Sequence, residues 1–118
     1  MSESGQTWRM AFKGLPEEAS HVRAWTGSHL HHADAPLIAN ELFVAILGHR
    51  IERRPAVIEL TISTAGKRIR ISASGSRPLP ALQSHGPGAL IISQLSDSSG
   101  SSTDFHSLWA QLTTEASR

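Results

Sequence analysis

The chain contains no cysteine and no tyrosine, and each absence excludes a class of function. Without cysteine there is no disulfide, no thiolate zinc site and no cysteine nucleophile. Three Phe and three Trp are few aromatic side chains for stacking the bases of a nucleic acid, so nucleic acid is not an expected partner. The balance of 11 Lys plus Arg against 10 Asp plus Glu excludes an acidic tail or a strongly basic arm as the organising feature.

Long hydrophobic runs are also missing. The longest apolar stretch, Leu42 to Leu47, is too short to cross a bilayer. Residues 1–30 hold no apolar segment behind a basic start, which a secretory signal needs. These patterns predict a soluble, cytoplasmic protein. At 118 residues we expect one domain over 7–113, with a flexible N-terminus at 1–6 and a C-terminal tail at 114–118.

The first elements are predicted from hydrophobic periodicity and helix-terminal signals. Trp8, Met10 and Phe12 alternate with polar or small neighbours, which is typical of a strand with one face on a core. A helix is expected to begin at Pro16, with two acidic residues in its first turn, and to end at Gly27. The sequence therefore opens with a strand and a helix.

A second helix follows, capped by Asp34 and running to about Gly48. Between residues 37 and 47 only Asn40 and Glu41 are polar, so we expect this helix to be enclosed on nearly every side. A carboxylate at Glu41 in such a helix needs a partner or a function.

The second half of the chain predicts a hairpin, a helix and a final strand. In order these are strands at 56–63 and 68–74, a loop at 74–88, a short helix at 89–95, a Ser-rich segment at 96–102 and a strand at 105–112. The fold class is an α/β (α+β) two-layer sandwich with a mixed, mostly antiparallel sheet and helices on one face. The other face of the sheet is then open to water or to a partner.

Five short segments, within or beside these predicted elements, carry a recognisable pattern. They are ADAP at 33–36, ELFVAILGH at 41–49, IRISASGSR at 69–77, GPGALI at 86–91 and LWAQL at 108–112. Together they resemble the histidine-kinase-like ATPases (GHKL, Bergerat fold), and within them the anti-sigma-factor serine kinases of the RsbW-like group. The family patterns are E-L-V-T-N-A-x-x-H, V-x-V-x-D-x-G, G-x-G-L-x-L and V-W-A-E-L. The resemblance covers about Trp8 to Leu112 and implies a Bergerat-type fold.

The chain departs from the family at positions that bind nucleotide. Ala45 replaces the asparagine that supplies an oxygen to Mg²⁺, an ion that requires a nearly complete octahedral oxygen shell. Gly75 replaces the aspartate that accepts a hydrogen bond from adenine, and Arg77 replaces a glycine beside the base. We therefore expect Mg-ATP binding and kinase activity to be lost, with no cofactor and no metal.

Other positions of the vestigial nucleotide pocket remain. By resemblance Glu41 takes the place of the catalytic base, although a carboxylate neutralised by Arg77 or another cation is the alternative. His49 is expected on the same helical stripe as Glu41 and Ala45, at i+8 from Glu41, where a packing or capping role is the alternative to catalysis. Gly86 and Gly88 precede a helix and could cradle an anion, or form an ordinary turn.

Arg68, Arg70 and Trp109 are the candidate partner-binding residues. They alternate with apolar neighbours on their strands, which places them on the open face of the sheet, where Glu59 is expected to pair with one of the arginines. An exposed Trp among arginines has the composition of an interface hot spot. A separate cluster, His29, His31, His32 and Asp34, has metal-ligand types, but a solvated loop is the favoured interpretation.

Three functions are consistent with these residues. The leading hypothesis is a non-enzymatic regulator that binds a sigma factor or an anti-sigma antagonist and forms a homodimer, as the resemblance implies. The second is an active ATP-dependent serine kinase with Glu41 as base and Arg77 or His85 on the phosphates. The third is a module that binds a different small ligand in the altered pocket.

Overall fold

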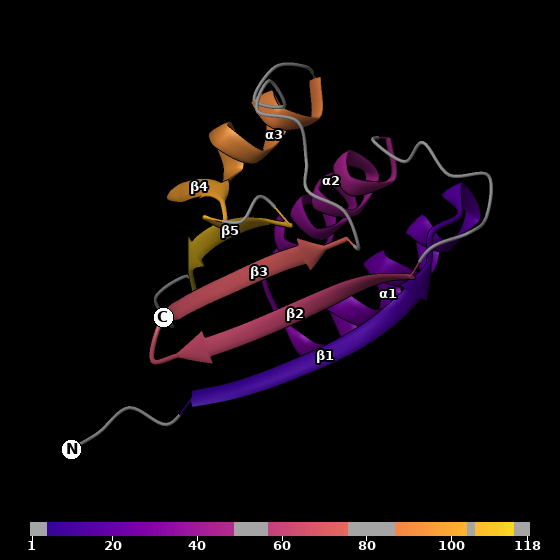
Figure 1. The fold of residues 1–118 in the computed structure, drawn as a ribbon. Coiled ribbons are helices and arrows are strands. Elements are labelled where there is room, and N and C mark those ends of the chain that lie inside the picture. The colour runs from indigo at the N-terminus through magenta and orange to yellow at the C-terminus, as the bar shows by residue number, and fades with distance from the viewer. Residues whose placement is uncertain (1–4, 49–56, 76–86, 104–105, 115–118) are drawn as a thin grey trace.

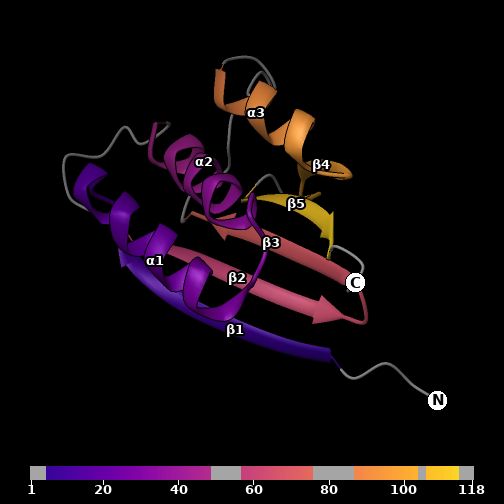
Figure 2. The ribbon, with the colours of Figure 1, turned by 180° about the vertical axis from the view of Figure 1, so that it is seen from behind.

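Five strands form one sheet, and three helices cover a single face of it (Figures 1 and 2). The computed structural model describes residues 5–48, 57–75, 87–103 and 106–114. The strands are β1 (Gly5–Lys13), β2 (Val57–Ala65), β3 (Arg68–Ser74), β4 (Ser98–Ser101) and β5 (Ser107–Thr113). The helices are α1 (Ala19–His29), which follows a 3-10 turn at Pro16–Glu18, α2 (Ala35–Gly48) and α3 (Pro87–Leu95). The expected two-layer α+β class is confirmed.

The sheet has the order β1-β2-β3-β5-β4, and every pairing among the described strands is antiparallel. The parallel component expected from the sequence is therefore absent from these strands. The reason is the position of β5, which lies between β3 and β4 and runs antiparallel to both. Strands β3 and β4 thus point the same way without being neighbours.

Strand β4 was not expected, because serine and glycine have low β-propensity and residues 96–102 are mostly serine. It forms at the edge of the sheet through its pairing with β5, from Ser98 opposite Gln111 to Ser101 opposite Leu108. The indole of Trp109 lies against Gly100, where a β-carbon would be 3.1 Å from Cζ2. An aromatic ring over a strand glycine is a known way of stabilising such a strand.

The end of α1 also differs from expectation, since the helix continues past Gly27 to His29. A glycine inside a helix costs about 1 kcal/mol, which tertiary contacts here outweigh. The His29 ring lies 5.0 Å from the Trp8 ring and 5.2 Å from the Trp25 ring, and its Nδ1 donates to the Trp25 carbonyl. The following Leu30 is buried in the core. These contacts hold the last turn of the helix.

Along each strand the side chains alternate between the face that packs on the helices and the open face of the sheet. On β2, β3 and β5 the side chains facing the helices are buried or pack on the core, as the alternation predicted; they are Ile58, Leu60, Ile62, Ile69, Ile71, Ala73, Leu108, Ala110 and Leu112. On the edge strand β1 the pattern is looser. Phe12 is buried, but Met10 on the same face remains 45% exposed.

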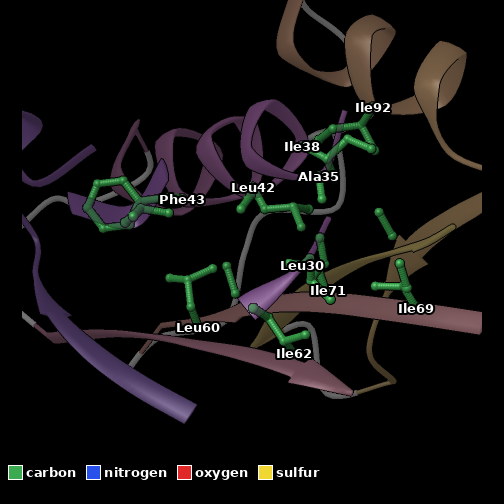
Figure 3. Close-up of a cluster of buried hydrophobic side chains, with 14 of the residues drawn as sticks. Leu30, Ala35, Ile38, Leu42, Phe43, Leu60, Ile62, Ile69, Ile71 and Ile92 are labelled. Atoms are coloured by element: carbon green, nitrogen blue, oxygen red, sulfur yellow. The ribbon is translucent and has the colours of Figure 1, made fainter. Parts of the chain in front are cut away.

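Helix α2 supplies the largest share of the helical side of the core. Its buried residues are Ala35, Ile38, Ala39, Leu42, Phe43 and Ile46, which recur at intervals of three and four. Figure 3 shows this stripe facing side chains of β2 and β3, with Ile92 of α3 closing one end. The expectation that α2 is enclosed on nearly every side is wrong. Leu37 and Val44 are 40% and 42% exposed, because α1 and α3 flank the helix without covering its outer stripe.

The hairpin between β2 and β3 turns through Gly66 and Lys67, with Ala65 opposite Arg68. Gly66 has φ 59°, a left-handed conformation in which a β-carbon meets the following carbonyl oxygen. We expect Gly66→Ala to lower the free energy of unfolding by about 1 kcal/mol. Urea denaturation measures the change, with Lys67→Ala as the control in the same turn. Equal stability of Gly66→Ala and the wild type would contradict the turn geometry.

None of the helices in the described ranges is both long and apolar enough to cross a membrane.

Candidate functional site

The residues of the vestigial pocket fall into two groups. Glu41, Ala45, Gly75 and Gly88 lie in the described structure, on α2, at the end of β3 and in the first turn of α3. The predictions for His49, Arg77, His85 and Gly86 lie outside the described residues.

Glu41 and Gly88 are brought together from α2 and α3. A β-carbon on Gly88 would stand only 2.9 Å from Glu41 Oε1, so the glycine permits the carboxylate to approach the first turn of α3. A negative charge is favoured near the N-terminus of a helix, where backbone N–H groups have no partner within the helix. The glycine at this position therefore makes room for the Glu41 side chain of the same chain.

The other oxygen of Glu41 accepts a hydrogen bond from its neighbour on α2. Asn40 Nδ2 donates to Glu41 Oε2 at 2.9 Å, and Arg23 donates through Nη1 to Asn40 Oδ1 at 2.6 Å. An arginine on α1 is thus connected through an amide to the carboxylate on α2. The sequence did not predict this series of hydrogen bonds. Its only signal there was the pair of polar residues, Asn40 and Glu41, in an otherwise apolar helix.

Gly75, which follows the last residue of β3, lies close to Ile46 of α2 and is hydrogen-bonded to His106. The Gly75 N–H donates to the His106 carbonyl at 2.9 Å, and His106 Nδ1 lies 3.3 Å from the Gly75 oxygen. A β-carbon here would lie 3.0 Å from Ile46 Cγ2, which is closer than side chains normally pack. Ile46 is itself buried. A side chain at this position would therefore press against Ile46.

Ala45 is half-buried one turn after Glu41 on α2. Its side chain carries no oxygen, so it cannot ligate Mg²⁺. With Ala45 and Gly75 in these places, the described part of the pocket offers Glu41 as its carboxylate, and that group is already hydrogen-bonded to Asn40.

The histidines that precede α2 do not converge. His29 Nδ1 is directed to the Trp25 carbonyl, and His32 Nδ1 accepts a hydrogen bond from the Asp34 N–H at 3.1 Å. Within the described ranges no three or more His, Cys, Asp or Glu side chains gather as potential metal ligands.

The open face of the sheet brings Arg70 and Trp109 into contact. The Arg70 guanidinium carbon lies 4.3 Å from the centroid of the Trp109 ring, a cation–π stack between β3 and β5. Arg68, two residues before Arg70 on β3, is also exposed and stands opposite Thr113. The prediction that these residues share the uncovered face is borne out by the register.

The expected pairing of Glu59 with one of these arginines is wrong. Register places Glu59 opposite Ser74, whereas Arg70 stands opposite Ser63. Four residues along a strand correspond to about 13 Å, which is too far for an ion pair. Glu59 therefore does not neutralise Arg68 or Arg70.

Comparison of the chain with family models gives no match, and comparison with curated proteins gives none either.

Proposed function

We propose that this domain is a regulatory protein-binding domain that acts without Mg-ATP chemistry and presents the open face of its sheet to a partner. The observation that carries the proposal is the close approach of Ile46 to Gly75, the position of the adenine-binding aspartate in the resembling kinases, where a β-carbon would lie 3.0 Å from Ile46 Cγ2. The absence of a side-chain oxygen at Ala45 removes a magnesium ligand from the same region.

The partner class follows from the resemblance to anti-sigma-factor kinases, which makes a sigma factor or an anti-sigma antagonist the proposed partner. Cytoplasmic location and self-association are parts of the same proposal. The order of strand, two helices, hairpin, helix and final strand supports the resemblance, because these elements occur in the structure in that order. The stacked Arg70 and Trp109 on an uncovered face support a binding role, because Arg and Trp are the side chains most enriched at interface hot spots.

Calorimetric titration of Mg-ATP into the full chain tests the loss of nucleotide binding. We expect no heat of binding up to about 1 mM nucleotide. Thermal unfolding gives a second readout, since a ligand at about 100 times its Kd raises the free energy of unfolding by about 2.7 kcal/mol. Magnesium-dependent binding in the micromolar range would reject the proposal. In that case loss of phosphate transfer in Glu41→Gln would assign the kinase function instead.

A further inference from the structure

The charges of the described residues are segregated between the two layers. Lys and Arg side chains lie mainly in the sheet and its hairpin turn, at Arg9, Lys13, Lys67, Arg68 and Arg70, whereas the helix layer holds Arg23. Carboxylates show the opposite distribution, with Glu17, Glu18, Asp34 and Glu41 in the helix layer. Within the described ranges the sheet is therefore mainly basic and the helix layer mainly acidic.

Register places the basic side chains on the open face. Arg9 pairs with Thr61 and Lys13 with Val57, which are outward positions of β2, and Arg70 pairs with the outward Gln111 of β5. Against these cations the same face carries Glu59, and Asp97 lies at its rim. Asp97 accepts a hydrogen bond from the Thr113 hydroxyl. The face is thus basic, with Arg70 and Trp109 near its middle.

Between the cations the face is lined by small hydroxyl side chains. They are Thr7, Thr61, Ser63, Ser72, Ser74, Ser98, Ser107 and Thr113. Hydroxyls both donate and accept hydrogen bonds, so they suit backbone amides as well as carboxylates. A five-stranded sheet is about 20 Å wide, and an extended chain of about six residues spans that distance.

We infer that the open face binds an acidic, extended segment of a partner protein, with its carboxylates on Arg9, Arg68 and Arg70 and an apolar side chain beside Trp109. This inference rests on the proposed protein-binding function and names the chemistry of the partner. Charge complementarity selects an acidic partner. A single-stranded nucleic acid fits less well, because the Arg70 guanidinium already covers the Trp109 ring on which a base would stack.

A second copy of the chain, docked through its acidic helices, is the other candidate occupant. It fits less well because some carboxylates of the helix layer are already engaged. Glu41 accepts from Asn40, and Glu18 is paired with His21. A separate acidic segment has no such internal competition.

Calorimetry with end-blocked hexaglutamate as the probe tests the inference on the full chain. We expect binding that weakens as salt is added, because the attraction between exposed charges is screened. Arg70→Gln and Arg9→Gln should each weaken binding about two- to fivefold, the range for loss of one exposed ion pair. Arg23→Gln is the matched control, since it removes the same charge from the helix layer and should leave the affinity unchanged. Circular dichroism of each variant confirms that it is folded.

Three outcomes would overturn the inference. The first is the absence of hexaglutamate binding, or equal weakening by Arg23→Gln. The second is hexathymidylate binding tighter than that of hexaglutamate, which would assign the face to nucleic acid. The third is self-association in sedimentation equilibrium that Arg70→Gln abolishes, which would assign the face to a second copy.

Failure of the inference and failure of the proposed function give different results. If neither hexaglutamate nor Mg-ATP binds, the inference falls and the proposed function stands. Binding of Mg-ATP rejects the proposed function whatever the peptide does.

Discussion

Replacing Phe43 with alanine is expected to remove about 3–5 kcal/mol from the free energy of unfolding. Phe43 is fully buried on α2, and its ring lies 6.4 Å from that of Phe12 at an interplanar angle of 78°. The edge-to-face pair joins the central helix to the edge strand β1, so truncation loses both apolar burial and an aromatic contact. Because small domains have a total stability of about 5–15 kcal/mol, this single change consumes a large part of it. Urea denaturation followed by circular dichroism measures the effect.

The adjacent Val44 provides a control for Phe43→Ala. It belongs to the same helix but is 42% exposed on the outer stripe. We expect Val44→Ala to change the free energy of unfolding by less than about 1 kcal/mol, because little buried volume is lost. Similar losses for the two variants would contradict the assignment of the buried and outer faces of α2.

Introducing a carboxylate by Gly75→Asp, as in the resembling kinases, is expected to destabilise the fold by about 1–3 kcal/mol and to leave Mg-ATP unbound. The reason is steric, since a β-carbon at Gly75 would stand 3.0 Å from Ile46 Cγ2. Gly75→Ala adds the β-carbon alone and should show part of the same loss. Denaturation and calorimetry on the same samples separate the effect on stability from the effect on binding.

A double-mutant cycle with Ile46→Ala tests the steric explanation. Ile46→Ala alone is destabilising because the side chain is only 4% exposed, but it makes room for the new carboxylate. The penalty of Gly75→Asp should then be smaller by about 1 kcal/mol in the Ile46→Ala background, which is a typical coupling between contacting residues. An unchanged penalty in both backgrounds would show that Ile46 is not what closes this position.

Most of the fold was predictable because its elements carry strong periodic patterns. Alternating apolar residues on β2 and β3, and apolar residues at intervals of three and four on α2, identified the two layers and the face of the sheet that packs on the helices. Strand β4 could not be predicted, because it depends on pairing with β5 and on Trp109 covering Gly100. The end of α1 was misplaced for a similar reason, since the ring of His29 packs against Trp8 from another part of the chain.

The sequence predicted that the candidate partner-binding residues lie on the open face of the sheet, but not which contacts they make. The sequence placed Arg70 and Trp109 on the open face, but only the structure brings the guanidinium over the ring. Register between distant strands also decided the error at Glu59, because no local pattern fixes which residue of β3 stands opposite it. The Arg23 to Asn40 hydrogen bond joins two helices and likewise has no local signal.

Total charge was the least informative feature of the sequence. A balance of +1 excluded extreme electrostatics, yet among the described residues most cations lie in the sheet and most carboxylates in the helix layer. Charged side chains on the strands alternate with core residues and so project from the open face, whereas those of the helix layer lie on the other side of the core. Steering of an acidic partner depends on that local field and not on the net charge.

Amide chemical-shift mapping of the labelled full chain tests the central claim most directly, because it reports both candidate sites in one measurement. Titration with end-blocked hexaglutamate should shift amides of β1, β3 and β5 around Arg70 and Trp109. Titration with Mg-ATP should leave the amides of Glu41, Ala45, Gly75 and Gly88 unmoved. Shifts at Gly75 and Gly88 on adding Mg-ATP, with the sheet amides unaffected by hexaglutamate, would contradict the account and identify a nucleotide-binding domain instead.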